Sequence, residues 1–245
     1  MNTSSNGYVM GFAIGVCVVI SAALALTANV LKPTQRAAAE FDRQKNVMIA
    51  GGLIQEGDPR PEAEIKDLYK KRVVEKVVDL GSGQVDTTKT PAGVAALKDP
   101  KEKARFRTIA VALDGEGKEE AFILPISGRG LWSTLYGYLA LEKDANTVRG
   151  ITFYQHGETP GLGGEVDNPQ WKDAWKGKHI LDEKGALVSV TVKKSKVDPS
   201  VPHEKLHYVD GLSGATITSN GVTKFVKVDL TAFKPYLSQY WGKKN

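Results

Sequence analysis

The sequence has one cysteine, Cys17, so it holds no cysteine pair for an internal disulfide bond. It also lacks two nucleotide-binding signatures: no G-x-x-x-x-G-K-[ST] phosphate loop is present, and no G-x-G-x-x-G follows a strand-like run. Strands and helices show no regular alternation. These absences disfavour a disulfide-stapled fold, a P-loop and a Rossmann fold.

Histidines are few and poorly spaced for a metal site. Only His203 and His207 are close in sequence, and they follow Pro202 in a stretch that we predict to be strand-like, where they would not align as helical ligands. Surface or packing roles are expected for them and for His156 and His179. The net charge of +5 comes from scattered lysines without interleaved aromatics, so nucleic-acid binding is not expected.

Charged residues are absent from residues 8–31. At about 1.5 Å per helical residue this run can cross a bilayer core of about 30 Å, which predicts a transmembrane helix. A cleaved signal peptide is the alternative, but no Lys or Arg precedes the run and it is long for such a peptide. Lys32 and Arg36 follow it, which by the positive-inside rule favours a cytoplasmic C-terminal part.

The rest of the chain predicts one further domain. We expect an N-terminal tail (residues 1–7), the membrane helix (8–31), a helical connector (32–60) and a folded domain (61–245). Within these parts, helices are predicted over 34–49, with Gly51 and Gly52 as a stop, and over 61–78. Residues 80–101 are rich in glycine and proline, which predicts an irregular surface segment.

Strand-like patterns dominate after residue 105. The runs 106–113 and 121–126 predict a hairpin, as do 135–141 and 148–156, and a further strand is expected over 187–192. The predicted fold class is therefore α+β: one N-terminal transmembrane helix, then an antiparallel sheet with flanking helices.

Small and hydroxyl-bearing residues crowd into residues 210–221, immediately before apolar residues at helical spacing. The pattern predicts a helix starting near Ser219, with Pro235 near its end and the apolar residues Val222, Phe225, Val226, Leu230, Phe233 and Leu237 on its buried side. A helix N-cap is the simplest explanation of the cluster, while an anion site at the helix entrance is the other. A hydrolase nucleophile at Ser213 is disfavoured, because the G-x-S-x-G elbow is broken by Ala215.

Residues 210–216, DGLSGAT, resemble the D-x-x-[ST]-G-A-[ST] signal of the FMN-binding domain family. In that family a flavin transferase links the FMN phosphate to the last threonine. The resemblance implies a covalent FMN on Thr216, with Ser213, Gly214 and Ala215 as the attachment loop. It is this family pattern that selects Thr216 over its neighbour Thr218.

Two further segments resemble the family of C subunits of sodium-pumping NADH:quinone reductases: 128–133, GRGLWS, and 158–163, ETPGLG. The second is shared with G subunits of Rnf complexes. The resemblance implies that these segments line the flavin, although a buried core role for Trp132 and a plain loop for 158–163 are the alternatives. The expected pocket residues are Leu131, Trp132, Ser133, Glu158, Thr159, Gly161, Leu162 and Gly163.

This resemblance implies an electron-transfer subunit that works only within a multisubunit membrane complex and turns over no substrate alone. NADH, quinone and sodium sites are then expected on partner subunits. It also implies a bacterial inner-membrane location with the soluble domain on the periplasmic side, where the flavin transferase works, against the weak charge preference noted above. The alternatives are an Rnf G subunit and a cofactor-free, membrane-tethered assembly module.

Overall fold

The computed structural model describes residues 5–242. The predicted N-terminal tail is thus described only from residue 5, and the last three residues of the predicted domain lie outside the described residues. The chain divides into two units, the first ending at Asp42 and the second beginning at Arg43.

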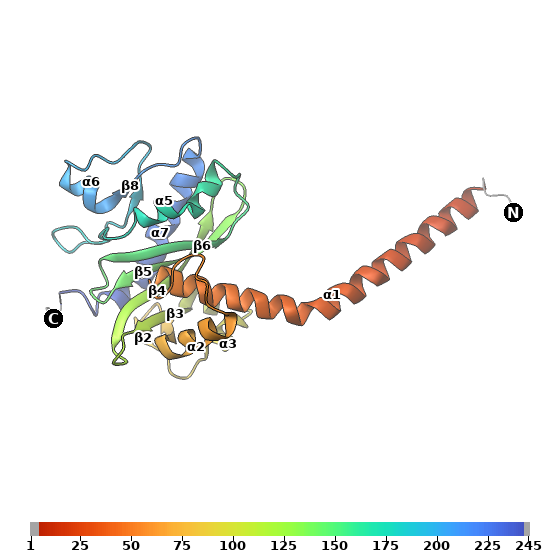
Figure 1. Ribbon diagram of the computed structural model, residues 1–245, viewed down its shortest axis with the longest axis horizontal. Helices are drawn as coiled ribbons and strands as arrows, with labels where there is room; N and C mark the ends of the chain where they lie inside the picture. The colour runs from red at the N-terminus through yellow and green to blue at the C-terminus, as the bar shows by residue number, and fades with distance from the viewer. Residues whose placement is uncertain (1–4, 243–245) are drawn as a thin grey trace. The chain divides into compact units, whose positions relative to one another are not determined.

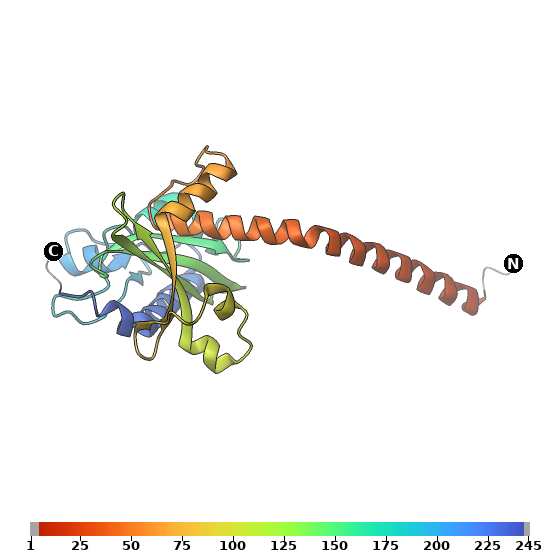
Figure 2. The same ribbon diagram turned by 90° about the horizontal axis from the view of Figure 1, so that it is seen from below.

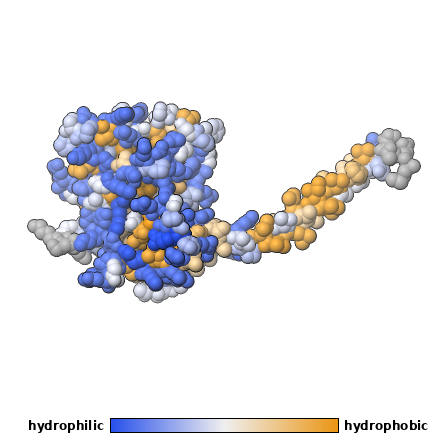
Figure 3. All heavy atoms as spheres, in the orientation of Figure 1, coloured by the Kyte–Doolittle hydropathy of each residue, from blue (hydrophilic) through white to orange (hydrophobic). Residues whose placement is uncertain are grey.

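The first unit belongs to the long helix α1 (Asn6–Ala50). Its most apolar stretch has a mean hydropathy of 2.6 and no buried residues, so its length and composition are those of a membrane-spanning helix (Figure 3). The helix predicted over 34–49 is confirmed as a continuation of α1. Its glycine stop is also confirmed: Gly52 has a φ of +66°, and the Leu53 N–H donates to the Met48 carbonyl at 2.9 Å.

The second unit is built on an antiparallel six-stranded sheet in the order β2-β1-β3-β4-β5-β6 (Figure 1). Both predicted hairpins are confirmed: β3 (Phe106–Leu113) pairs with β4 (Glu119–Arg129), and β5 (Thr134–Glu142) pairs with β6 (Val148–Gln155). β1 (Val73–Asp79) and the short β2 (Gln84–Val85) complete the sheet.

Helices cover both faces of the sheet (Figures 1 and 2). α7 (Thr216–Leu237) buries the whole predicted apolar stripe against one face, where Phe122 of β4 meets Tyr236 edge to face. The last turns of α1 lie on the other face, where Ile123 reaches Gly51. Because side chains alternate along β4, one strand supplies the core on both faces.

The helix predicted over 61–78 is wrong in its second half. α2 (Glu62–Arg72) ends there and β1 begins at Val73, because the β-branched pairs of VVEKVVD fit a strand that finds a complete partner in β3. Residues 80–101 are also less irregular than predicted. They hold β2 and α3 (Pro91–Ala95), which Thr90 caps by accepting the Gly93 N–H at 3.1 Å, and the start of α4 (Pro100–Arg105).

The strand predicted over 187–192 is much shorter than expected. Only β7 (Thr191–Val192) forms, and it pairs in parallel with β8 (Tyr208–Val209) outside the main sheet. The remaining elements are η1 (Gly163–Asp167), α5 (Pro169–Asp173) and α6 (Pro202–His207). The stretch around His203, predicted to be strand-like, is therefore a short helix, because Pro202 suits a first helical turn.

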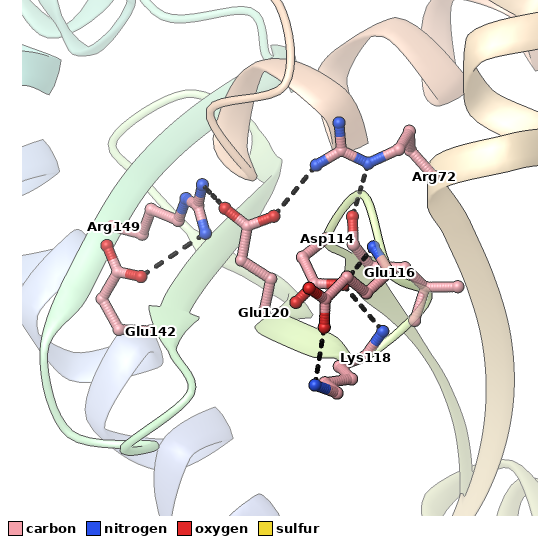
Figure 4. A network of polar contacts seen from close by, with 8 residues as sticks. Arg72, Asp114, Glu116, Lys118, Glu120, Glu142 and Arg149 are labelled. Atoms are coloured by element: carbon pink, nitrogen blue, oxygen red, sulfur yellow. Dashed lines mark hydrogen bonds and ion pairs between the residues drawn. The ribbon is translucent and has the colours of Figure 1, made fainter. Parts of the chain in front are cut away.

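A chain of ion pairs ties α2 to the sheet (Figure 4). Glu120 of β4 accepts from Arg72 of α2 at 3.0 Å and from Arg149 of β6, and Arg149 also reaches Glu142 of β5 at 3.4 Å. At the end of the β3–β4 hairpin, Asp114 accepts the N–H groups of Glu116 and Lys118. Because these contacts are partly exposed to solvent, each of them adds little to stability.

The ion pair between Asp79, at the end of β1, and Arg105 can be tested by measuring stability as a function of pH. The Arg105 guanidinium lowers the pKa of Asp79 from 3.8 to about 2 through hydrogen bonds of 2.6 and 3.1 Å, helped by the Gly81 N–H and opposed by desolvation. A depressed carboxyl pKa stabilises the fold above the unfolded value of about 3.9, and this contribution is lost as the pH falls toward the folded value. Asp79→Asn should therefore unfold at a lower temperature than wild type at pH 7, and the gap should close between pH 4 and about pH 2. A gap that stays constant over that range would contradict the ion pair.

Candidate functional site

Three segments far apart in sequence converge at one end of the sheet: 130–133 after β4, 158–163 after β6, and 213–218 at the start of α7. Glycines make the approach possible. A Cβ atom on Gly163 would lie 2.7 Å from Thr218 Oγ1, one on Gly130 would lie 2.7 Å from Glu158 Oε1, and one on Gly214 would lie 2.7 Å from Leu162 Cδ2. The 158–163 loop thus contacts both of the other segments through positions that have no room for a side chain.

Glu158 lies at the centre of this convergence and is only 5% exposed. Its carboxylate accepts the backbone N–H groups of Leu131, Trp132 and Ser133 at 3.0 to 3.1 Å. It also accepts the Thr218 hydroxyl at 2.6 Å. One side chain therefore fastens the 130–133 loop to the first turn of α7.

Two opposing effects set the ionisation of Glu158. Burial raises the pKa of this carboxyl, but the hydrogen bonds from Thr218 and from the backbone of Ser133, Trp132 and Leu131 outweigh burial, and the pKa is lowered below its usual 4.5. Glu158 is thus a buried, permanently ionised clamp near neutral pH. All of these donors belong to this chain, so the carboxylate holds the 130–133 loop and α7 together.

α7 begins at Thr216, three residues before the predicted start at Ser219. Its N-cap residue, Ala215, has no side chain that caps the helix, and the first helical hydrogen bond runs from the Ser219 N–H to the Ala215 carbonyl at 2.9 Å. The hydroxyl cluster therefore does not cap the helix. Within the described part of the chain the N–H groups of Thr216, Ile217 and Thr218 have no hydrogen-bond acceptor, and the helix dipole favours an anion at such an end.

The two candidate threonines differ sharply in their surroundings. Thr216 is exposed at the first position of α7. Thr218 is only 1% exposed, and its hydroxyl is committed to Glu158. An enzyme that adds a bulky group to a hydroxyl can reach Thr216 without disturbing the fold, whereas Thr218 would first have to leave the clamp.

Large apolar side chains remain exposed around this helix entrance. Trp132 is 65% exposed, Leu131 and Leu162 are each 43% exposed, and Ile217 is 57% exposed. The core role weighed for Trp132 therefore does not hold in this fold. A group of exposed apolar side chains beside free helix N–H groups suits a ligand that has a flat apolar part and a phosphate.

The other predicted site residues fall in the same loops. Ser213 and Gly214 are exposed just before α7, with a φ of +69° at Gly214. Thr159 and Gly161 are exposed in the 158–163 turn, which closes when the Thr159 carbonyl accepts from Leu162 at 3.1 Å and from Gly164 at 2.9 Å. Ala215 is 5% exposed and packs into the core below them.

His156 contributes to the site, although no role there was predicted for it. Its Nε2 lies 2.7 Å from Asp167 Oδ2, and its Nδ1 accepts the Glu158 N–H at 3.2 Å. Beside it the Gly157 N–H donates to Ser133 Oγ at 2.7 Å. The only signal in the sequence was its position two residues before Glu158.

The histidines expected to have packing roles form no metal cluster among residues 5–242, where no group of three or more His, Cys, Asp or Glu could hold an ion. His203 and His207 lie ring to ring in α6 with centroids 4.8 Å apart. The Nδ1 of His207 is 2.8 Å from the His179 carbonyl, a contact that packs α6 against the preceding loop.

Gly163→Ala should disrupt the clamp, because its new Cβ would lie 2.7 Å from Thr218 Oγ1 and 2.9 Å from Glu158 Oε2. We expect a loss of about 1–3 kcal/mol in the free energy of unfolding, the usual cost of overpacking. Gly157→Ala is the matched control, since its nearest neighbour, Ser133 Cβ, would be 3.4 Å away. Thermal unfolding of the full-length chain in detergent, followed by tryptophan fluorescence, measures both. Equal effects of the two substitutions would contradict the tight approach at Gly163.

Residues 130–230 match the FMN-binding domain family. Over 240 aligned residues the chain is 43% identical to the C subunit of the Na(+)-translocating NADH-quinone reductase of Pseudomonas aeruginosa, with 90% of each chain covered. The fold is similar to the crystal structure of NqrC from Shewanella oneidensis, at 30% identity and a TM-score of 0.69, covering 83% of this chain and 98% of that one. It is also similar to the corresponding C subunit from Parabacteroides distasonis, at 26% identity and a TM-score of 0.68, covering 88% and 98%. This chain therefore belongs to the family of C subunits of Na(+)-translocating NADH-quinone reductases.

Proposed function

We propose that this chain is a membrane-anchored electron-transfer subunit of a sodium-translocating NADH:quinone reductase, and that it carries FMN in a phosphoester bond to Thr216. The observation that carries the proposal is the uncapped entrance of α7, where the exposed Thr216 hydroxyl lies beside unused helix N–H groups. Family membership supplies the class of protein, and this entrance supports the cofactor and its attachment point.

The phosphate is expected at the first turn of α7. The N–H groups of Thr216, Ile217 and Thr218 precede the first helical hydrogen bond, and a phosphodiester keeps one negative charge that the helix dipole stabilises. Gly214, with its positive φ, and the small residues Ser213 and Ala215 let the backbone approach that phosphate closely.

The flavin ring is expected against the exposed side chains of Leu131, Trp132 and Leu162. Bound FMN supplies the reversible uptake and release of electrons, and this chain's residues hold and orient it. Glu158 and Ser133 fix the loop that presents Trp132, while Thr159, Gly161 and Gly163 shape the facing turn. The described residues provide neither a nucleotide fold nor a multispan ion path, so NADH, quinone and sodium sites are assigned to partner subunits.

The anchor is α1, which we place in the bacterial inner membrane as a single span, with the soluble part (residues 61–245) on the periplasmic side. The charge pattern alone favours the opposite side, but long domains translocate largely regardless of charge, and the flavin transferase must reach Thr216. The side of the membrane on which the soluble part lies can be tested by fusing to the C terminus a reporter that is active only in the periplasm. A reporter that works only in the cytoplasm would reverse the assignment.

The cofactor is tested on the native complex. Trypsin releases residues 206–224 as one peptide, which includes Thr216 and Thr218. Mass spectrometry should find this peptide heavier by one FMN less one water, with fragment ions that place the addition on Thr216. An unmodified peptide from active complex would refute covalent attachment and favour a cofactor-free assembly module. Copurification with Rnf subunits in place of the quinone reductase would instead favour the Rnf alternative.

A further inference from the structure

The segment that carries the 158–163 turn is closed at its base by one contact. It follows β6 at His156 and ends with η1 at Asp167, and the Nε2 atom of His156 lies 2.7 Å from the Oδ2 atom of Asp167. A surface loop of this length whose ends meet is an Ω-type loop, a kind of loop that is frequently functional. The contact between His156 and Asp167 therefore fixes where the segment begins and where it ends.

The other ring nitrogen of His156 fixes the first residue of the turn. Its Nδ1 atom accepts the backbone N–H of Glu158 at 3.2 Å. A side-chain acceptor bound to the N–H two residues further on forms the kind of turn that Asn and Asp also make. Among the histidines within residues 5–242, only His156 has both ring nitrogens in hydrogen bonds, and its side chain is only 13% exposed. The ring is therefore held in one orientation.

These two contacts assign the proton of the ring. An Nδ1 atom that accepts the Glu158 N–H carries no proton, so the neutral ring has its proton on Nε2, which donates it to Asp167. Without Asp167 the ring could hold its proton on Nδ1 instead, where it would face another donor, the Glu158 N–H. Asp167 therefore selects the tautomer in which His156 can hold Glu158.

Glu158 passes this constraint on to the other two segments of the site. Its carboxylate accepts the N–H groups of residues 131–133 and the hydroxyl of Thr218. Where the backbone of Glu158 lies thus decides where its carboxylate meets the loop from which Trp132 is exposed. A loss of the His156 contact would be felt along this whole series of hydrogen bonds.

We propose that His156 is a positioning residue for the flavin: Asp167 fixes its tautomer, its Nδ1 atom holds the backbone of Glu158, and Glu158 holds the loop that presents Trp132. This inference rests on the flavin site proposed above. Without the Nδ1 acceptor the 158–163 turn loosens and the flavin is more exposed to water, so its redox potential moves toward that of free FMN.

Substitutions separate the two ring nitrogens. Asparagine places an acceptor where Nδ1 lies, and glutamine places a donor where Nε2 lies. In the full-length, flavin-free chain in detergent, the Glu158 N–H should exchange with solvent as slowly in His156→Asn as in wild type, and about five- to tenfold faster in His156→Gln. His203→Gln, at an exposed position of α6, is the control and should leave this exchange unchanged. Unchanged exchange in His156→Gln would overturn the role of Nδ1.

The redox potential separates positioning of the flavin from a purely structural role. In chains loaded with FMN by a flavin transferase, His156→Gln should shift the midpoint potential toward that of free FMN, and His156→Asn should keep the wild-type value. Asp167→Ala should shift the potential of the wild-type chain but not that of the His156→Asn chain, because the asparagine acceptor needs no choice of tautomer.

Equal shifts by Asp167→Ala in both backgrounds would show that the Asp167 charge acts on the flavin directly, and would overturn the proposal. Equal potentials in His156→Gln and His156→Asn would overturn it as well. A wild-type chain that takes up no FMN would refute the proposed function instead, and the exchange of the Glu158 N–H would still decide whether His156 holds the turn.

Discussion

Thr216→Ala should yield a chain without covalently bound flavin. When the protein is made together with a flavin transferase and run on a denaturing gel, the wild-type band should fluoresce under ultraviolet light and the variant band should be dark, a loss of essentially all signal. The reason is chemical, since alanine has no hydroxyl for the phosphoester. Because Thr216 is exposed and its side chain makes no contact in the core, the variant should fold normally. Thr216→Ser, which restores a hydroxyl, should recover fluorescence.

Thr218→Val is the matched comparison, two residues along the same helix. The substitution keeps the shape of the side chain but removes the 2.6 Å hydrogen bond to Glu158. It should leave the band fluorescent and cost about 1–3 kcal/mol of unfolding free energy, because a hydrogen bond to a buried charged group is lost. A fluorescent Thr216→Ala chain together with a dark Thr218→Val chain would move the attachment to the other hydroxyl and contradict the argument from exposure.

Glu158→Gln should be the most destabilising conservative change at the site. Glutamine keeps one carbonyl acceptor where the carboxylate offers two oxygens, and its NH2 group would face backbone N–H groups that also need an acceptor. Leaving buried donors unsatisfied around a lost charge is expected to cost about 2–4 kcal/mol. Thermal unfolding of the full-length chain measures this loss. We also expect weaker flavin-dependent electron transfer in the assembled complex, because the loop that presents Trp132 is released.

Glu165→Gln is the control in the same segment. Among residues 5–242 this carboxylate accepts from the Asn168 side chain alone, at 2.9 Å, so its loss should change stability by no more than about 0.5 kcal/mol. The pH dependence separates the two carboxylates further. Since the pKa of Glu158 is lowered in the fold, its stabilisation is present above the unfolded value of about 4.3 and fades as the pH falls through the folded value. Wild type and Glu158→Gln should therefore converge in acid. A difference that persists unchanged at low pH would contradict the clamp.

Local patterns predicted the elements whose partners are close in sequence. The two hairpins were predicted from alternating runs joined by short turns, and the apolar stripe of α7 from its spacing of three and four. The predictions are wrong where the secondary structure of a segment depends on a pairing partner that is distant in sequence. Residues 73–78 were predicted to end a helix, yet β3, about thirty residues away, offers a full antiparallel ladder. The expected strand at 187–192 had no such partner in the main sheet and shortened to β7.

At the candidate site, too, local residue patterns were visible in the sequence while contacts between distant segments were not. The three segments that we propose to hold the flavin could be identified from the sequence by family resemblance, but the contacts among them could not. Nothing in the sequence states that the carboxylate of Glu158 holds the backbone of residues 131–133 and the hydroxyl of Thr218. The sequence pattern also could not predict whether the hydroxyl cluster caps α7, because capping depends on the backbone conformation at Ala215 and on whether a side chain there accepts a hydrogen bond from the helix.

By itself, the sequence determined the uncharged membrane-length run and the α+β class, since these depend on composition and on residues adjacent in the chain, and it carried the motif whose family resemblance points to Thr216. Only the tertiary structure decided that Thr218 is buried while Thr216 is open, and that Glu158 is a clamp with a lowered pKa. The physical reason is that burial and hydrogen bonding of a side chain depend on what the rest of the fold brings within a few ångströms of it, and those neighbours come from distant segments, 60 residues away for Glu158 and Thr218 and 102 for Ser127 and Asp229.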